Sequence, residues 1–154
     1  MINELKIMRM LDHPNILKLY EVCETENSLY MVMDLLQGGS LIDKIREKPV
    51  FTEAEAAPLM KGMLRAIEHA HSRGIMHRDL KPENILFRST NFKEDDVVLA
   101  DFGLSTVINE KKYLFFRCGT PGYVAPEVIN LKDENATYSE VCDVFSLGVI
   151  FHIM

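Results

Sequence analysis

The stretch His77-Arg78-Asp79-Leu80-Lys81-Pro82-Glu83-Asn84 decides how the rest of this chain is interpreted. It places a carboxylate, an ammonium and a carboxamide between Asp79 and Asn84, and Pro82 restricts how the backbone turns there. Apolar runs flank it, Ile75-Met76 before and Ile85-Leu86-Phe87 after. The pattern predicts a rigid polar loop held between buried elements, where functional side chains are common. A solvated surface turn would explain each residue singly, so the choice depends on polar groups elsewhere.

A matching carboxylate follows downstream, where Asp101 comes directly after the apolar run Val97-Val98-Leu99-Ala100. If that run pairs with the apolar run after the polar loop, Asp101 returns to the vicinity of Asp79. These carboxylates and the amide oxygen of Asn84 are hard ligands suited to Mg²⁺, and Lys81 suits a phosphate oxygen. The set predicts a phosphate-and-magnesium site, although an aspartate in this position is, taken alone, more often a turn residue.

Composition limits the partners. The chain has 154 residues, 47% hydrophobic and 26% charged, which is ordinary for one globular domain. The formal net charge of -6 argues against a nucleic acid or an anionic membrane surface and favours a basic peptide. Three widely spaced cysteines indicate reduced thiols rather than a disulfide or a zinc site. We expect a cytoplasmic location, with the nucleus open.

In the first third of the chain, the pattern of apolar residues changes once, from helical spacing to strand-like runs. Apolar residues at helical spacing predict a helix over residues 2–11. Two β-rich runs, residues 16–23 and 28–34, predict antiparallel strands joined by the polar residues 24–27.

Helices dominate afterwards. Ser40 can cap a short helix over residues 41–47, and Thr52 with Glu55 forms a capping box for a long helix that ends before Gly74. The polar connection over residues 88–96, which joins two short strands, contains a small charge cluster that is expected to be solvated. The fold class predicted is α+β, with strands first, helices later and charged loops at their junction.

The motifs His77-Arg78-Asp79 with Lys81 and Asn84, then Asp101-Phe102-Gly103, then Ala125-Pro126-Glu127, resemble in order and spacing the eukaryotic protein kinase signature set. The resemblance implies a protein-kinase-like fold that is only partly present, an incomplete kinase domain over residues 1–154. Residues 1–34 would be a remnant of the N-lobe, residues 35–39 the hinge, and residues 40–154 a partial C-lobe.

The resemblance also assigns catalytic roles. Asp79 would accept or orient the proton of the substrate hydroxyl, and Lys81 would neutralise charge on the γ-phosphoryl group of ATP. Asn84 and Asp101 would hold magnesium ions. Thr120 would hydrogen-bond to both Asp79 and Lys81, tying the substrate platform to the site.

Residues outside the loop would bind the nucleotide. Glu4 falls where kinases place the helix glutamate that pairs with a strand lysine to orient phosphates. Met33 would gate the back of the adenine pocket, and the backbone of Asp34-Leu35-Leu36 would bond the adenine edge. Leu41 and Leu86 would lie under the adenine ring.

The same resemblance indicates the type of kinase. Lys81 and the run Gly119-Thr120-Pro121 are similar to the serine/threonine branch, and Glu83 would face a basic residue on the peptide. Residues 118–127 and 143–149 are similar to the calcium/calmodulin-dependent kinase group, which implies possible regulation by calmodulin through other regions. Asp143 would hold the backbone of the polar loop.

A catalytically inactive pseudokinase or scaffold is the alternative. Intact Asp79, Asn84 and Asp101 argue against it, because a binding module does not need all three. The helical patterns at both ends look interrupted, so we expect a fragment that lacks the glycine-rich loop and strand lysine, has little activity alone and folds marginally. The predicted strand pair and the helix over residues 144–154 would leave apolar faces exposed.

Overall fold

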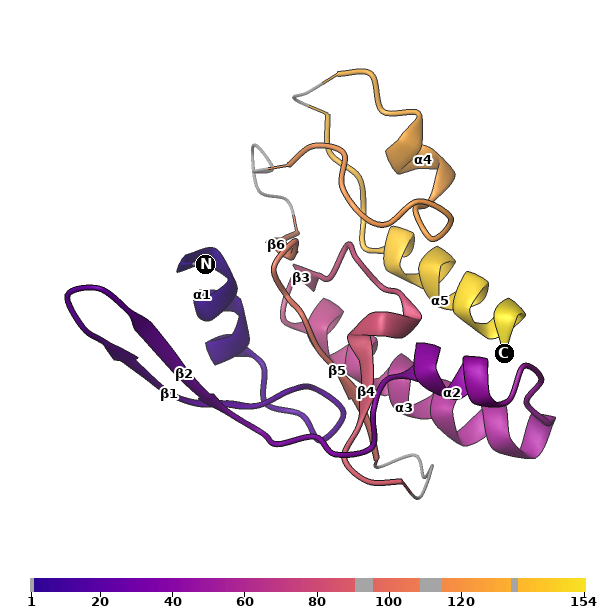
Figure 1. The fold of residues 1–154 in the computed structure, drawn as a ribbon. Helices are drawn as coiled ribbons and strands as arrows, with labels where there is room; N and C mark the ends of the chain where they lie inside the picture. Colours follow the sequence, from indigo (N-terminus) through magenta and orange to yellow (C-terminus); the bar gives the residue numbers. More distant parts are fainter. Residues whose placement is uncertain (1, 91–95, 109–114, 134–135) are drawn as a thin grey trace.

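The computed structural model describes residues 2–90, 96–108, 115–133 and 136–154 (Figure 1). Helix α1 (Ile2–Met10) and the hairpin of β1 (Leu19–Glu24) and β2 (Leu29–Met33) form one side of the molecule. The elements of the other side are α2 (Leu41–Glu47), α3 (Glu53–Ser72), β3 (Ile75–Met76), the 3₁₀ helix η1 (Pro82–Asn84), β4 (Ile85–Phe87), β5 (Val97–Leu99), β6 (Thr106–Val107), α4 (Pro126–Ile129) and α5 (Val141–Ile153). The predicted α+β class is therefore confirmed.

The first hairpin forms as predicted but begins later. Strands β1 and β2 pair antiparallel, and the turn is closed by the amide of Thr25, which donates to the carbonyl of Ser28 at 2.8 Å. Ile16 is not part of this pairing, because it forms an isolated parallel bridge with Leu99 of β5. The amide of Leu17 also donates to the carbonyl of Leu99 at 2.9 Å. The residues before β1 therefore join the hairpin to the larger part of the molecule.

Local side-chain chemistry sets the starts of the two predicted helices. Ser40 caps α2, where its hydroxyl accepts the amide of Asp43 at 3.3 Å. At the start of α3, a carboxylate oxygen of Glu55 accepts the amide and the hydroxyl of Thr52, both at 2.9 Å. Both helices begin at the residue after the predicted cap.

Helix α3 is the centre of the core. Its predicted apolar stripe is buried, and the stripe packs in one cluster with residues of α1, α5 and the short strands. Burial of each large side chain stabilises the fold by about 1.5–3 kcal/mol. The members of the stripe are Leu59, Met63, Ala66, Ile67 and Ala70.

Two small sheets place the polar loop. Strand β3, which pairs with β6, comes directly before the loop, and β4, which pairs antiparallel with β5, comes directly after it, with Ile85 opposite Leu99. Just beyond β5, the amide of Ala100 donates to the carbonyl of Asn84 at 2.9 Å. The loop and the residue that follows Ala100, Asp101, therefore meet at one end of this hairpin, as the sequence predicts.

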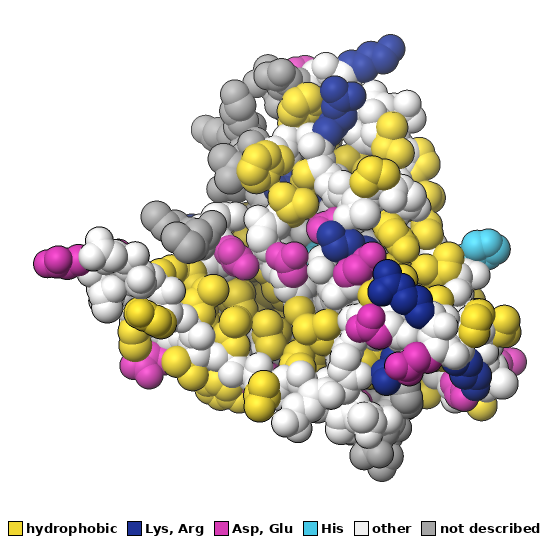
Figure 2. All heavy atoms as spheres, viewed as in Figure 1, with side chains coloured by type: hydrophobic (Ala, Val, Ile, Leu, Met, Phe, Trp, Pro, Cys, Tyr) yellow, Lys and Arg dark blue, Asp and Glu magenta, His cyan; other side chains and the backbone are white. Residues whose placement is uncertain are grey.

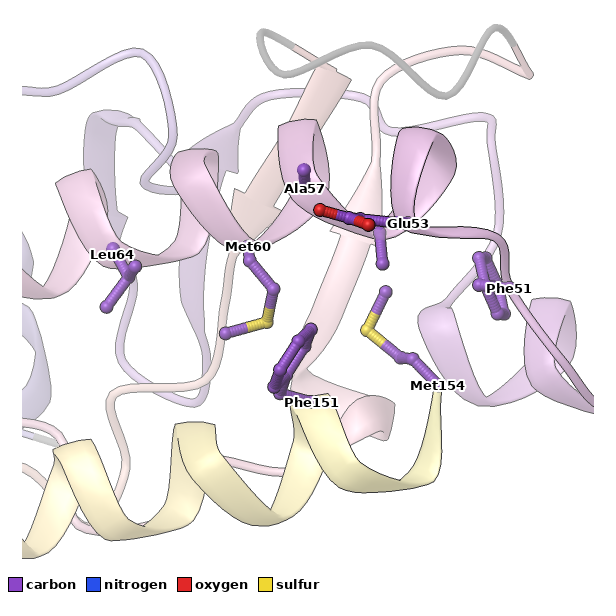
Figure 3. Close-up of a pocket in the computed structure, with 8 residues that line it drawn as sticks. Phe51, Glu53, Ala57, Met60, Leu64, Phe151 and Met154 are labelled. Atoms are coloured by element: carbon purple, nitrogen blue, oxygen red, sulfur yellow. The ribbon is translucent and has the colours of Figure 1, made fainter.

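Apolar side chains are exposed on the two elements where the sequence predicts them, the hairpin and the last helix. In the hairpin, Tyr20, Tyr30 and Val32 are exposed, and α5 exposes Val144 and Phe151 among others. A pocket of about 680 Å³ lies between α3 and α5. Figure 3 shows side chains from both helices pointing into it. Within the described ranges, no helix combines the length and the apolar character needed to cross a membrane.

Candidate active site

A buried carboxylate fixes the backbone of the polar loop. Asp143, in the first turn of α5, is 1% exposed and accepts the amides of His77 at 2.9 Å and Arg78 at 2.8 Å. His71 of α3 places Nε2 2.9 Å from the same carboxylate. Arg78 has a φ of 69°, in the left-handed region that a long side chain rarely adopts. Asp143 thus holds the loop in a conformation that the loop alone would not favour, in the role that the resemblance implies.

His77 connects the loop to the segment after β5. Its Nδ1 accepts the amide of Asp79 at 3.2 Å, so Nε2 carries the proton and donates to the carbonyl of Ala100 at 3.1 Å. Burial lowers the pKa of His77 below its ordinary value, which keeps the ring neutral and suits this arrangement. The ring also lies 4.8 Å from that of Phe102.

Asp79 lies among three polar groups that the sequence predicts for the site. Its Oδ1 accepts the hydroxyl of Thr120 at 2.7 Å, and its Oδ2 accepts Nζ of Lys81 at 2.7 Å. Lys81 also donates to the Thr120 hydroxyl at 3.0 Å. The side chain of Asn84 donates to the backbone carbonyl of Asp79 at 2.9 Å. These four residues form a connected cluster, whereas Glu83 lies on the exposed side of the loop.

The electrostatics of this cluster favour charged side chains. Burial raises the pKa of Asp79, but the hydrogen bonds from Lys81 and Thr120 outweigh it, and the pKa is lowered overall. The pKa of Lys81 is raised, first by its hydrogen bond to Asp79. Asp79 is therefore an ionised hydrogen-bond acceptor at neutral pH, and Lys81 is a nearby cation.

Asn84 and Asp101 fit the magnesium role as a pair. Because Nδ2 of Asn84 is used within the loop, Oδ1 is the atom left for a cation. Asp101 is exposed, has a φ of 60°, and uses Oδ1 to accept the amide of Gly103 at 3.1 Å. Two oxygen ligands suffice for Mg²⁺ when water and phosphate supply the others. No group of three or more His, Cys, Asp or Glu side chains in the described ranges is arranged to hold a metal ion.

The segment over residues 34–39, the hinge segment, is anchored at both ends and open between them. The amide of Asp34 donates to the carbonyl of Lys18 at 3.2 Å, and the amide of Gly38 donates to that of Phe87 at 2.9 Å. Leu35 between these anchors is 80% exposed. Among the described residues, the amide of Leu36 has no partner, so this backbone edge is available to a ligand. Figure 2 shows hydrophobic side chains gathered in a hollow beside the β1–β2 hairpin, with acidic side chains at its rim.

The predicted nucleotide contacts need one correction. Met33 is partly exposed and Leu86 is half-buried, and Ser40 forms a bridge with Leu86. Leu41, however, is fully buried in the core, so it has no surface for contact with an adenine ring. It belongs instead to the same core cluster as Ile85 and Phe87, the neighbours of Leu86 in β4. Glu4 lies in the first turn of α1, and within the described residues no ion pair joins it to the polar loop.

No role was assigned from the sequence to two arginines that have defined contacts in the structure. Arg78 is buried and donates to the carbonyls of Leu104 at 2.7 Å and Phe115 at 2.8 Å, which joins the loop to both ends of the segment after Asp101. Arg88 begins the polar connection over residues 88–96, and it forms a part-buried ion pair with Asp34 at 3.0 Å. Their partners are distant in sequence, so no local pattern reveals them.

Comparison with known proteins agrees with this geometry. The family described as protein kinase domain matches residues 1–154. Myosin light chain kinase A of Dictyostelium discoideum is 45% identical over 153 residues, 98% of this chain and 50% of that protein. Calcium/calmodulin-dependent protein kinase type 1B of Homo sapiens is 44% identical over 152 residues, 99% of this chain and 43% of that protein.

A third relative is calcium/calmodulin-dependent protein kinase type 1 of Macrobrachium nipponense, 41% identical over 152 residues, 99% of this chain and 42% of that protein. The chain thus spans about half the length of the curated relatives it matches. The match over the whole chain and the cluster around Asp79 lead to one conclusion: this chain belongs to the protein kinase family.

Proposed function

We propose that the protein carrying this chain transfers the γ-phosphate of ATP to serine or threonine hydroxyls of protein substrates. The observation that supports the proposal best is the cluster in which Asp79 is held by Lys81 and Thr120, each at 2.7 Å. Phosphoryl transfer asks the protein mainly to position groups and to stabilise charge, and this cluster supplies a fixed acceptor beside a cation.

Each side chain has a separate task. Asp79, charged at neutral pH, orients the substrate hydroxyl, and its lowered pKa makes it a weak base that takes the proton only as the new bond forms. Lys81 neutralises charge on the phosphoryl group, and Thr120 keeps both side chains in place. Magnesium, held by Asn84 and Asp101, would supply further neutralisation of the phosphates.

The backbone edge of the hinge segment is the proposed site for the adenine ring, and Met33 and Leu86 are the proposed apolar contacts. Glu4 would act on the phosphates through a lysine. The substrates proposed are peptides with basic residues, because Glu83 is exposed beside the cluster and the chain is acidic. Regulation by calmodulin is proposed because two relatives are calcium/calmodulin-dependent protein kinases. A cytoplasmic or nuclear location stays a prediction.

The test uses the full-length protein, ATP, magnesium and a basic peptide with one serine. Asp79→Asn should lower kcat by about 10³-fold, and Asp101→Asn should also nearly abolish turnover. The matched control is Glu26→Gln, which changes an exposed carboxylate in the hairpin turn and should leave kcat unchanged. Nucleotide binding by the wild type without phosphate transfer would refute the proposal and favour the pseudokinase.

A further inference from the structure

The side chain of Asp34 is committed to other parts of the protein. One carboxylate oxygen accepts the hydroxyl of Tyr20 at 2.6 Å, and the other accepts Nη1 of Arg88 at 3.0 Å and the amide of Lys18 at 3.3 Å. The carboxylate is only 10% exposed. A ligand at the hinge segment can therefore use the backbone of Asp34 but not its charge.

Arg88 connects three separate segments. Its Nη1 bonds Asp34, and its Nη2 donates to the carbonyl of Pro14 at 2.9 Å, in the loop after α1. Its own carbonyl accepts the amide of Gln37 at 3.3 Å, at the other end of the open edge. One residue thus contacts the hinge segment on both sides of Leu35-Leu36.

The Arg88–Asp34 ion pair is less exposed than the neighbouring Lys18–Asp12 pair. The Lys18–Asp12 pair has side chains that are 46% and 80% exposed, and such pairs contribute little. In the Arg88–Asp34 pair the values are 34% and 10%, and two further donors satisfy the carboxylate. The pKa of Asp34 agrees, since burial raises it but the hydrogen bonds from Tyr20 and Arg88 lower it overall.

We propose that Arg88 is a positioning residue that bridges Asp34 and Pro14, fixes the backbone of the hinge segment and thereby sets the affinity for adenine nucleotides. The inference rests on the proposed function in taking the ligand to be a nucleotide. The atoms available to the adenine edge lie between Asp34 and Gln37. If the Asp34 anchor is lost, the ligand must order this backbone as it binds, which lowers affinity.

The test compares Arg88→Met, Arg88→Lys and a control, Arg46→Met, in the full-length protein. Arg46 forms an exposed pair with Asp43 at 3.5 Å in α2. Calorimetry with ADP and steady-state kinetics with ATP and peptide are measured. Arg88→Met should raise the Kd of ADP and the KM of ATP about tenfold, with kcat and the KM of the peptide nearly unchanged. Arg88→Lys should recover part of the affinity, and Arg46→Met should match the wild type.

Hydrogen exchange of the hinge segment gives a readout that needs no nucleotide. Faster exchange at the hydrogen-bonded amides of Asp34 and Gln37 in Arg88→Met supports the positioning role. This support holds even if the wild type binds no ADP, a result that would refute only the proposed function. Unchanged exchange, or an unchanged Kd in a folded variant, overturns the inference. If Arg88→Met does not fold, Tyr20→Phe removes only a hydroxyl from the same carboxylate. A Kd raised about threefold in that variant supports the role, and an unchanged Kd refutes it.

Discussion

The hydroxyl of Thr120 donates a 2.7 Å hydrogen bond to Oδ1 of Asp79, joining residues 41 positions apart. The bond crosses from the run Gly119-Thr120-Pro121 to the polar loop, so the position of the proposed base depends on a segment outside the loop. The same hydroxyl accepts a bond from Lys81. Thr120 therefore orients two charged groups at once.

Replacing Thr120 with valine should separate geometry from charge. Valine keeps the branched shape but removes the hydroxyl, so Asp79 and Lys81 lose a common partner and kcat should fall about 10²-fold. Steady-state kinetics of the full-length protein measure this, with Thr120→Ser as the control that keeps the hydroxyl. Equal kcat values for the valine and serine variants would show that the bond is not needed.

Asp143→Asn should destabilise the protein more than any exposed aspartate change. Asparagine offers one oxygen, so a buried amide of His77 or Arg78 is left without its charged acceptor, and the free energy of unfolding should fall by about 3 kcal/mol. Urea unfolding followed by circular dichroism gives the value. Asp12→Asn, at an exposed pair, is the matched control and should change little.

Gly38→Ala should disrupt the hinge segment. A Cβ there would lie 2.2 Å from the carbonyl oxygen of Ser89 and 2.5 Å from Cβ of Phe87, so the backbone must move away from β4. We expect a loss of about 2 kcal/mol or more. Gly148→Ala in α5 has no atom within 4 Å of the new Cβ and should be neutral or slightly stabilising. Similar unfolding midpoints for the two variants would contradict this account.

Stability should fall as the pH is lowered from about 7 to 5. Burial lowers the pKa of His13, His69 and His77 below the ordinary 6.5, so the unfolded chain binds more protons in this range. The lowered pKa of Asp79 acts only in more acidic solution, because its contribution is lost as the pH falls through its folded value.

His69→Phe tests this pH dependence. The ring of His69 lies 5.1 Å from that of His13, and its buried Nε2 has no hydrogen-bond partner in the described structure. Phenylalanine keeps the ring contact and removes the titration. Urea midpoints at the two pH values should therefore differ less in the variant than in the wild type, and an equal difference would refute the role of His69.

Local chemistry made much of the fold predictable from the sequence. The helix over residues 41–47 has the predicted bounds, because the hydroxyl of Ser40 accepts the amide of Asp43 and caps the first turn. The start of β1 was placed too early, because Ile16 pairs with a strand that lies far along the chain. The pattern alone could not show a partner from that distance.

Some residues of the candidate site could also be identified from the sequence, and others could not. The residues around Asp79 were identified because several motifs occur together in order, although their contacts cross many positions. Arg88 was not identified, because a single arginine in a polar connection carries no signal and Asp34 lies 54 positions away. Leu41 was assigned to ligand contact from the kinase resemblance, which does not distinguish an apolar residue that lines a pocket from one buried beneath it.

The Asp143 contacts have a consequence for the order in which the chain becomes functional. The amide of His77 depends on a carboxylate 66 positions later, so the loop is synthesised well before the residue that shapes it. During vectorial synthesis on the ribosome, the emerging loop lacks that acceptor and its left-handed turn at Arg78 has no support. The polar loop should therefore reach its catalytic geometry only when α5 packs against it. A nascent chain should stay inactive until that helix has docked.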